Sequence, residues 1–393
     1  MNISTFDSTT LAISLALVVL AILTTLTNPF LRFRRKKDED DMNQEDGRAL
    51  PPLSLILTPH DEAAQLERHL PTLLHQYYPA GYQVIVVAEQ GDHETEDTLK
   101  RIAHSYAQQP AHAKLYVTHI PDSSRYMSRK KLAVTLGVKA AEAEWVVLTE
   151  AYCEPASDRW LLTMAAHCAD DKNLVVGYGN YTDTTSAFKR FERLHEAYYL
   201  MREASRGTAF RTNSCNLMFR KSEFMDHDGY LGNLNLIRGE YDFIVNKYAR
   251  RLSTALVTVP EAWVIDDEPS RRTWLNTHIF YLETRKYLDR RMRHAMLFNL
   301  DQTALHGNYL LQVAAIAYGG LTTNWTVLGA AAFAIFVTFI CRALIGRRAL
   351  RDFGEDISAV KVIPYEICIA WNHLSYLIKH RMADKLDFTT HKQ

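Results

Sequence analysis

The chain has 393 residues, which is long enough for two domains or for one large domain with additions. Its 45 Lys and Arg residues are balanced by 45 Asp and Glu residues, and this zero net charge argues against a general polyanion binder such as a nucleic-acid protein. The cysteines are odd in number, widely scattered and form no pair at metal-ligand or redox spacing, so we interpret them as reduced thiols in a cytosolic setting. They are Cys153, Cys168, Cys215, Cys341 and Cys368.

The first predicted element is an N-terminal transmembrane anchor over residues 1–32. Residues 8–31 contain no charged side chain, and a helix of about 20 such residues spans a bilayer core. The basic stretch RFRRKK follows the apolar run, whereas in a cleavable signal peptide it would precede it. By the positive-inside bias, the chain after this anchor is expected in the cytoplasm. A charged linker is expected over residues 33–52, with an acidic run at 38–46.

From residue 53 the sequence predicts an alternation of strands and helices. Short apolar runs rich in branched residues are typical of buried strands. They occur at residues 53–57, 83–88, 114–120 and 145–149, and segments with apolar residues at helical spacing lie between them, at residues 62–78, 95–107 and 130–143. Four strands joined by helices imply an α/β fold, with a mainly parallel, Rossmann-like sheet flanked by helices. Ligands bind such sheets beyond the carboxyl ends of the strands.

Acidic residues follow three of these strands. Asp61 and Glu62 come after the first strand, Glu89 after the second and Glu150 after the fourth. Carboxylates at that edge can accept hydrogen bonds from a base or a ribose, and they can hold a hard divalent cation that bridges two phosphates. They can equally be helix N-caps and first-turn acids that suit the helix dipole. For Asp61 alone we favour this second interpretation.

Five segments, taken in order, carry a resemblance to a known family. They are SLILTPHDEAAQLERHLPTLLHQYYP, VIVVAEQGDHETEDTL, KKLAVTLGVKAAEAEWVVLTEAYCEPAS, NLMFRKSEF and GEYDFIVNKYA. Over about residues 53–270 the chain resembles membrane-associated family 2 glycosyltransferases, which have the GT-A fold. The resemblance implies a GT-A domain over residues 53–300. It also implies transfer of a sugar from a nucleotide diphosphate donor to an acceptor hydroxyl, with inversion at the anomeric carbon as in most enzymes of the family. A carboxylate removes the acceptor proton, while a metal and nearby cations stabilise the departing diphosphate.

The resemblance also implies a nucleotide-sugar site that holds base, ribose and phosphate. Its residues would be Glu62, Glu89, Lys130 and Lys131. The metal-binding Asp-x-Asp of the family falls on Glu150, Ala151 and Tyr152, which makes Glu150 the expected ligand of Mn²⁺ or Mg²⁺. Tyr152 cannot replace a carboxylate as a hard-metal ligand at neutral pH, because a phenol stays protonated up to a pKa of about 10.

The catalytic-base motif of the family falls on the stretch Gly-Glu-Tyr-Asp, where Glu240 would be the base and Asp242 its structural partner. The segment NSCNLMFRKSEF predicts a turn, a strand and a helix start. In the family this segment lines the acceptor side, and Asn216 matches the asparagine usually found there. A buried asparagine that satisfies backbone groups is an equal alternative. The family's Gln-x-x-Arg-Trp motif, expected after Trp274, has no convincing equivalent.

A transmembrane hairpin is predicted over residues 304–342. Residues 307–341 carry no Lys, Arg, Asp or Glu, the polar stretch TTNWT interrupts them, and basic residues on both flanks favour an even number of crossings. One tilted span or a buried pair of soluble helices is the alternative. Residues 343–393 are expected to form a basic, amphipathic cytoplasmic tail. Within it, residues 362–382 suit an interfacial helix or a helix packed against the hairpin.

These features predict a glycosyltransferase anchored in a bacterial inner membrane, with its catalytic domain facing the cytoplasm. It would use a nucleotide diphosphate sugar to extend a glycan or a lipid-linked acceptor, with membrane lipids as a further partner and no nucleic acid. The alternative is a catalytically inactive relative that serves as a binding or scaffold subunit in a glycan-assembly complex. Tyr152 and the missing arginine motif favour the alternative, whereas the charge kept at Glu89, Glu150 and Glu240 favours an enzyme.

Overall fold

The computed structural model describes residues 7–35, 49–108, 113–120 and 128–389, so the predicted acidic run lies outside the described residues. Contacts divide the chain into two compact units. The helical unit consists of Met1–Arg35, Ala187–Tyr199 and Met292–Ser375, and the sheet unit consists of Lys36–Ser186, Leu200–Arg291 and Tyr376–Gln393. The domain boundaries expected from the sequence stay predictions.

The sheet unit is built on a seven-stranded sheet with the order β3-β2-β1-β4-β8-β6-β9. Its strands are β1 (Leu53–Leu57), β2 (Tyr82–Glu89), β3 (Ala113–Ile120), β4 (Trp145–Leu148), β6 (Leu174–Gly177), β8 (Leu217–Arg220) and β9 (Thr254–Val257). β1 pairs in parallel with β2 and β4, β2 with β3, and β6 with β9, whereas β8 is antiparallel to both its neighbours. The four predicted strands and the mainly parallel sheet are confirmed.

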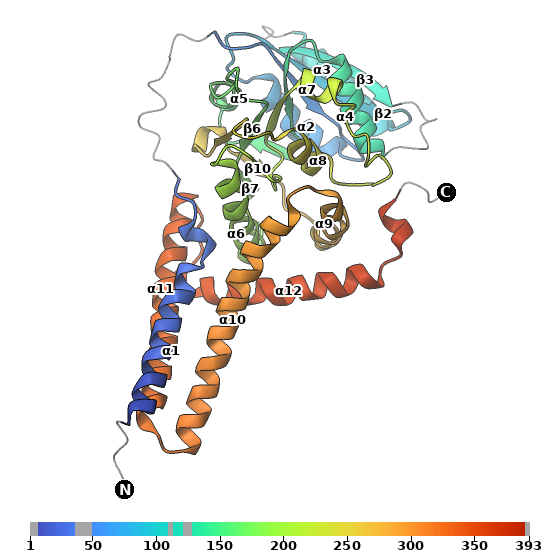
Figure 1. The fold of residues 1–393 in the computed structure, drawn as a ribbon. Coiled ribbons are helices and arrows are strands. Elements are labelled where there is room, and N and C mark those ends of the chain that lie inside the picture. Colours follow the sequence, from blue (N-terminus) through green and yellow to red (C-terminus); the bar gives the residue numbers. More distant parts are fainter. Residues whose placement is uncertain (1–6, 36–48, 109–112, 121–127, 390–393) are drawn as a thin grey trace. The chain divides into compact units, whose positions relative to one another are not determined.

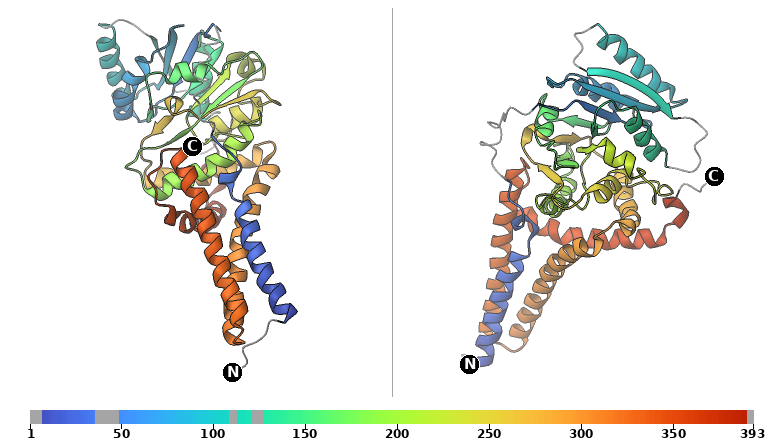
Figure 2. Two further views of the ribbon diagram at one scale, coloured as in Figure 1. Left: turned by 90° about the vertical axis from the view of Figure 1, so that its left-hand side faces the viewer. Right: turned by 45° about the horizontal axis from the view of Figure 1, so that its top comes forward.

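Helices cover both faces of this sheet (Figures 1 and 2). Successive strand residues point to opposite faces, so Leu55 of β1 joins the core under α2 (Ala63–Leu74) and α3 (His93–Tyr106), and Ile56 joins the core under α4 (Arg129–Ala140). The approach of α4 is close because it presents Gly137 to β1: a Cβ there would lie 2.6 Å from the Ile56 side chain. The packing of α4 sets the position of its first turn above the strand ends.

A second, three-stranded sheet has the order β5-β10-β7 and consists of β5 (Cys153–Pro155), β7 (Gly179–Tyr181) and β10 (Val264–Asp266). β10 is antiparallel to β5 and parallel to β7. The short turn between β4 and β5 carries Glu150. The other helices of the sheet unit are α5 (Trp160–Ala165), the last turn of α6 (Ala187–Ala204), α7 (Lys221–Asp226), α8 (Glu240–Tyr248), α9 (Arg271–Thr284), the end of α12 (Val362–Met382), and the 3₁₀ turns η2 (Pro260–Ala262), η3 (Arg285–Tyr287) and η5 (Lys385–Phe388).

The helical unit contains three long helices and the greater part of α6 and α12. They are α1 (Ser8–Leu26), α10 (Arg291–Leu321) and α11 (Trp325–Asp352), with the 3₁₀ turns η1 (Pro29–Leu31) and η4 (Ala359–Lys361). α1 lies along α11 in Figures 1 and 2, with Ala21, Ala331 and Ala334 buried in the cluster between the helices. Small side chains allow this close approach. α10 and α11 form a helical hairpin around residues 322–324, and α12 runs crosswise to them (Figure 1). The transmembrane hairpin expected over residues 304–342 stays a prediction.

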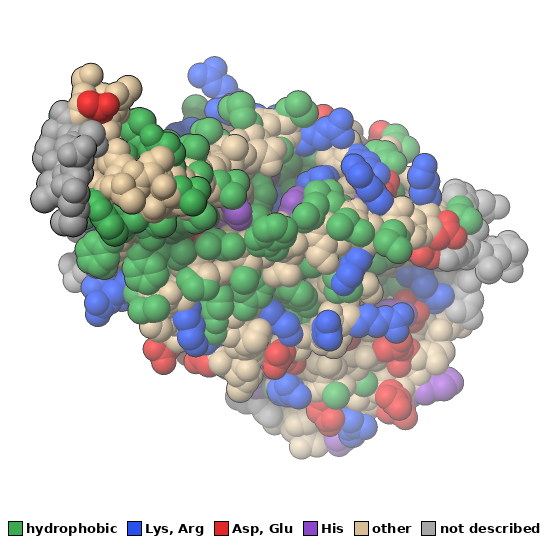
Figure 3. Space-filling view, turned by 90° about the horizontal axis from the view of Figure 1, so that it is seen from below, with side chains coloured by type: hydrophobic (Ala, Val, Ile, Leu, Met, Phe, Trp, Pro, Cys, Tyr) green, Lys and Arg blue, Asp and Glu red, His purple; other side chains and the backbone are tan. Residues whose placement is uncertain are grey.

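Among the described residues, two helices are long and apolar enough to cross a membrane by length and composition, Ser8–Leu26 and Trp325–Asp352. In each helix, 28% of the apolar 18-residue stretch is buried. Figure 3 shows hydrophobic side chains gathered on the face seen from below. α10 is more polar. Its Asn308 donates to the Thr338 hydroxyl (3.1 Å) and its Gln312 to the Leu17 carbonyl (3.1 Å), so these side chains are bonded inside the unit.

Candidate functional site at the strand ends

The carboxyl ends of β1 and β4 and the first turns of α4 and α8 bring four charged residues together. They are Glu62, Lys130, Glu150 and Glu240. Lys130 Nζ donates a 2.9 Å hydrogen bond to the Thr58 carbonyl and also binds the Glu150 carboxylate. Ser128 caps α4 by accepting from the backbone N–H of Lys131, which starts the helix just before Lys130. The acids predicted after the first and fourth strands therefore share one site with the predicted lysine.

This group is largely withdrawn from water, and its charges shift one another. Burial raises the pKa of Glu150, and Lys130 opposes that rise. Burial likewise raises the pKa of Glu62 to about 7, against the opposing charge of Lys130 and with a further contribution from Glu150. Burial lowers the pKa of Lys130, but the Glu150 and Glu62 carboxylates outweigh it and raise that pKa above its ordinary value. The lysine is therefore charged at neutral pH.

Two carboxylate oxygens of the group keep acceptor capacity. Within the described part of the chain, Glu62 Oε2 and Glu240 Oε1 are buried atoms that have no hydrogen-bond partner. Buried polar atoms are nearly always bonded in folded proteins, so unbonded acceptor atoms within a group of charged residues indicate a place for a ligand's donors.

Glu240 owes its position to a glycine turn. Gly239 has φ 100°, a left-handed conformation, and a Cβ there would lie 2.8 Å from the Phe243 ring. The turn starts α8 with Glu240 and Asp242 in the first turn, where the helix dipole favours carboxylates. Glu240 acts electrostatically on the Lys130–Glu150 pair, whereas Asp242 Oδ1 lies 3.7 Å from a guanidinium nitrogen of Arg211.

Glu89 belongs to a neighbouring ion-pair group. Its carboxylate lies 2.9 Å from His60 Nδ1 and 3.0 Å from a guanidinium nitrogen of Arg129. The capping interpretation of Asp61 is wrong: Asp61 is exposed with φ 54°, and the N-cap position of α2 falls on Glu62 because the helix begins one residue later than that interpretation requires.

Lys131, expected beside the phosphates, is turned into the core. Its side chain is fully buried, and Nζ donates to the carbonyls of Asn233 and Leu236, both at 2.7 Å. Burial lowers its pKa to about 8, against the opposing charge of Glu240. Because the 233–236 loop leads into α8, Lys131 supports the turn that carries Glu240.

Asn216, expected on the acceptor side, is fully buried and bonded within the protein. Its amide nitrogen donates to the carbonyls of Tyr178 (3.0 Å) and Ala262 (2.7 Å), and its oxygen accepts from Trp160 Nε1 (3.1 Å). Both amide hydrogens and the oxygen are therefore in use. This geometry fits the alternative in which the asparagine satisfies backbone groups.

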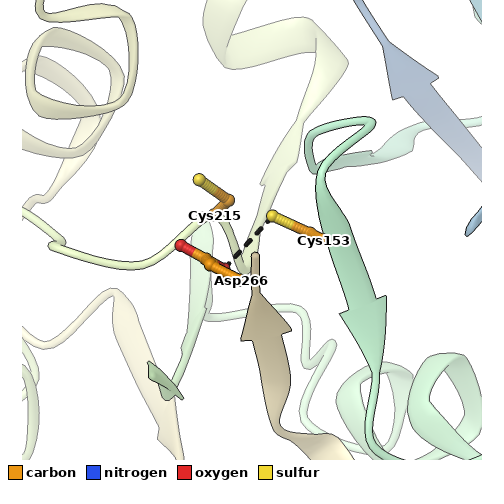
Figure 4. A group of neighbouring side chains, drawn as sticks. All are labelled: Cys153, Cys215 and Asp266. Carbon is orange, nitrogen blue, oxygen red and sulfur yellow. Dashed lines mark hydrogen bonds between the residues drawn. The ribbon is translucent and has the colours of Figure 1, made fainter. Parts of the chain in front are cut away.

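One group of residues was missed by the sequence analysis. Cys153, Cys215 and Asp266 lie together, and one ligand atom from each is within 4.8 Å of the other two (Figure 4). The Cys153 thiol donates to Asp266 Oδ1 at 3.2 Å, and the Tyr152 hydroxyl lies 3.5 Å from Cys215 Sγ. Burial raises the pKa of the Cys153 thiol well above its ordinary value, so this thiol is protonated in the hydrogen bond.

Sequence motifs for metal-binding cysteines rely on cysteines that are close in sequence, whereas Cys153 and Cys215 are far apart. The available signal was that Cys153 follows the predicted fourth strand and Cys215 precedes the strand of the NLMFR segment. These strands, β4 and β8, pair antiparallel with Leu148 opposite Leu217, which brings the end of one beside the start of the other.

The similarity of this chain to known proteins lies in its structure. No family model and no curated protein sequence matches the chain. It is similar to the solved structure of mannosyltransferase PcManGT from Pyrobaculum calidifontis in complex with GDP-Man and Mn²⁺, with a TM-score of 0.52 and 16% identity over 92% of this chain and 98% of that chain. The two chains share a fold. S. aureus TarS residues 1–349, in complex with UDP-GlcNAc, gives a TM-score of 0.42 and 13% identity over 84% of this chain and 92% of that chain.

Proposed function

We propose that the protein is a glycosyltransferase of family 2 and GT-A type that transfers a sugar from a nucleotide diphosphate donor to an acceptor hydroxyl. The observation that carries this proposal is the buried Lys130–Glu150 pair, flanked by unused acceptor oxygens of Glu62 and Glu240. It lies at the carboxyl ends of parallel strands, where α/β folds bind ligands. The shared fold is one on which a mannosyltransferase is built.

Lys130 is the residue that we assign to the donor diphosphate. An ammonium has three hydrogens to donate. The Thr58 carbonyl and the Glu150 carboxylate accept two of them, which leaves one for a phosphate oxygen. Glu62 and Glu89 would accept hydrogen bonds from the base and the ribose, and Lys131 would act indirectly by holding the loop before α8.

A hard divalent cation does not fit the position of the family's metal motif. Mn²⁺ and Mg²⁺ prefer several oxygen ligands, but Glu150 is bound to Lys130 and Tyr152 supplies a phenol whose pKa burial raises well above its ordinary value. Across the described residues, the three ligand atoms that converge belong to Cys153, Cys215 and Asp266 rather than to a group around Glu150. We therefore assign charge compensation to Lys130, and the expected Mn²⁺ or Mg²⁺ stays a prediction that titration can test.

Glu240 is the group that we assign as general base. It removes the proton of the acceptor hydroxyl, and the acceptor oxygen then forms a bond to the anomeric carbon of the donor sugar. The bond from that carbon to the diphosphate oxygen breaks, and the diphosphate leaves with the electron pair beside Lys130. Attack from the face opposite the leaving group inverts the anomeric configuration. The Asp242–Arg211 pair holds the first turn of α8 during this step.

We also propose that the protein acts at a bacterial inner membrane, with α1 and the α10–α11 hairpin as its anchor and the sheet unit in the cytoplasm. The low burial of the two apolar helices supports this assignment, because the core helix of a soluble protein would be mostly buried. α12 exposes apolar side chains such as Trp371, which is 63% exposed, as a helix at a lipid surface would. A lipid-linked or membrane-proximal glycan is the acceptor that fits this setting.

The proposal is tested by calorimetric titration of the detergent-purified protein with a panel of nucleotide diphosphate sugars, with and without Mn²⁺. The bound donor is then supplied with a membrane lipid extract, and release of nucleoside diphosphate is measured. Glu240→Gln is expected to lower turnover by about 10²–10⁴-fold with donor affinity unchanged. Glu94→Gln, at an exposed residue of α3, is the matched control and should behave as the wild type.

Tyr152 supports a second candidate function, a non-catalytic subunit that binds a nucleotide sugar or a partner transferase. Its phenol stands where the family has its second metal-binding acid. This candidate predicts that the wild-type protein releases no nucleoside diphosphate above a protein-free control, and that Glu240→Gln changes nothing. Turnover by the wild type that Glu240→Gln abolishes would exclude it.

A further inference from the structure

We infer that Cys153, Cys215 and Asp266 form a binding site for one thiophilic divalent cation of the Zn²⁺ type. The inference is independent of the proposed transferase activity. Tetrahedral zinc sites have Zn–S distances of about 2.3 Å and Zn–O distances of about 2.0–2.2 Å, which places ligand atoms roughly 3.4–3.8 Å apart. Here the three ligand atoms lie within 4.8 Å of one another, and Cys153 Sγ is 3.2 Å from Asp266 Oδ1. Small side-chain movements would complete the geometry.

The three ligands stand on a framework of paired strands. Cys153 and Asp266 are direct partners in the antiparallel β5–β10 pair. Cys215 lies two residues before β8, which pairs with β4 in the main sheet. The backbones of Cys153 and Asp266 are therefore held in place by ladder hydrogen bonds, and Cys215 lies next to a paired strand. Such placement of ligands by rigid elements lowers the cost of ordering a metal site.

Burial differs among the ligands in a way that allows a cation to enter. Cys153 and Asp266 are buried, whereas Cys215 is only partly buried, so a cation can reach its sulfur from solvent. Three protein ligands leave a fourth tetrahedral position for water.

Chemistry favours zinc over the hard cations. Two sulfur ligands select thiophilic metals, whereas Mg²⁺ and Mn²⁺ prefer sites made of oxygen ligands. Zinc would take the place of the proton that Cys153 donates to Asp266, so binding releases protons to solvent and weakens as the pH falls. The bound cation would tie β5, β10 and the start of β8 together beneath the turn between β4 and β5.

The direct test uses the reduced, full-length wild-type protein in detergent. Addition of Co²⁺ is expected to give a thiolate-to-cobalt absorption band that saturates at one equivalent and disappears when Zn²⁺ is added. This measurement needs no variant. If the wild type shows no thiolate band, or if peptide mapping shows Cys153 and Cys215 joined as a disulfide in the purified reduced protein, the inference is overturned.

Substitutions then locate the site. Cys153→Ser and Cys215→Ser are each expected to lower zinc affinity by more than the about 10–100-fold that loss of an outer-shell partner costs. Cys168→Ser removes a partly buried thiol elsewhere and should leave the affinity unchanged. Zinc bound equally well by a Cys153→Ser/Cys215→Ser double variant would be adventitious and would overturn the assignment.

The carboxylate ligand has a control beside it in sequence. Asp266→Asn is expected to weaken zinc binding at least tenfold, because a neutral amide replaces a charged ligand. Asp267→Asn should leave zinc binding unchanged, since Asp267 faces Arg68 and His69. Zinc excess should also raise the melting temperature of the wild type but not that of Asp266→Asn. Equal zinc affinities for the two variants would contradict the proposed ligand set.

Discussion

Arg342 in the helical unit and Lys130 in the sheet unit are both buried cations paired with carboxylates, but the two groups differ in how fully those carboxylates are bonded. Arg342 Nε lies 2.7 Å from Glu366 and a second guanidinium nitrogen lies 3.3 Å from Asp301, and all three side chains have no exposed surface. Asn28 and Thr27 donate to these same two acids at 2.8 and 3.0 Å. The other Asp301 oxygen accepts from further side chains, so all four carboxylate oxygens have donors.

The group around Lys130 is incomplete by comparison. Lys130 binds Glu150, yet Glu62 and Glu240 each keep a buried oxygen with no partner in the described part of the chain. A fully bonded ionic network specifies one arrangement of helices and costs most when a member is removed. A partly bonded network leaves capacity for a ligand. We therefore interpret the Arg342 group as structural and the Lys130 group as functional, and four substitutions can break or sharpen this distinction.

The largest effect is expected from Arg342→Met. It leaves Asp301 and Glu366 buried without their cation, and breaking a buried ion pair in this way costs about 3–5 kcal/mol. Chemical denaturation in mild detergent, followed by circular dichroism, should show this loss in the free energy of unfolding. Arg347→Met, at an exposed arginine of α11, is the matched control and should change stability little. Equal losses for the two variants would mean that the network does not hold the helices together.

The next effect is a change with pH in the free energy of unfolding, which we attribute to Glu62. Its folded-state pKa is raised from about 4.5 to about 7, so the folded protein holds this proton more tightly than the unfolded chain. The stabilisation is therefore fully present below about pH 4.5 and is lost as the pH rises through 7. The shift corresponds to at most about 3 kcal/mol.

Unfolding free energies measured from pH 4 to 8 should thus fall more steeply for the wild type than for Glu62→Gln. Glu67→Gln, at an exposed acid of the same helix, should keep the wild-type slope. If the unfolding free energies of Glu62→Gln and the wild type changed with pH in parallel, the pKa of Glu62 would not be raised in the folded protein. The distinction between the Lys130 group and the fully bonded Arg342 group would then be weaker.

A smaller effect is expected on ligand affinity from Lys130→Met. Charge-assisted hydrogen bonds contribute about 1.5–3 kcal/mol, so donor binding should weaken roughly 10–150-fold. The fold should survive, because Glu150, whose pKa burial already raises, can take up a proton when the lysine is gone. Calorimetric titration with the donor that binds the wild type measures this change. Lys139→Met, at an exposed lysine near the end of α4, should bind as the wild type does.

The same contrast explains what the sequence can and cannot predict. β1 and β4 were located to within one residue, because every residue in them is buried and continuous apolar runs of this kind are a local signal. The convergence of Glu62 and Glu150 was also predictable, since it follows from the rule that parallel strands share one carboxyl edge. The same rule also grouped Glu89 with them, but Glu89 pairs with His60 and Arg129 beside the site, and Lys130 was expected there only from the family resemblance.

The burial of Lys131 was not predictable, because its partners are carbonyls of a distant segment. The burial of Asn216 was one of two alternatives that the sequence left open, and its partners could not be named because they too are distant in sequence. The Cys153–Cys215 proximity depends on the antiparallel β4–β8 register, which no local pattern encodes. In the helical unit, the position of Arg342 just after a charge-free run indicated a membrane flank. Its pairing with two acids from other helices is likewise tertiary.

The smallest effect separates the core of the Arg342 network from its outer members. Thr27→Val keeps the side-chain shape but removes a hydroxyl that donates to the Thr24 carbonyl (2.7 Å) and to Asp301 (3.0 Å). Asp301 retains the Arg342 contact and its other donors. The expected loss is about 0.5–1.5 kcal/mol in the unfolding experiment described for Arg342→Met. Thr9→Val removes a similar hydrogen bond to Asp7 at an exposed position and should cost close to nothing. If Thr27→Val lowered the free energy of unfolding as much as Arg342→Met does, the network would depend on every one of its donors. If it lowered that free energy not at all, the remaining donors to Asp301 would be sufficient without Thr27.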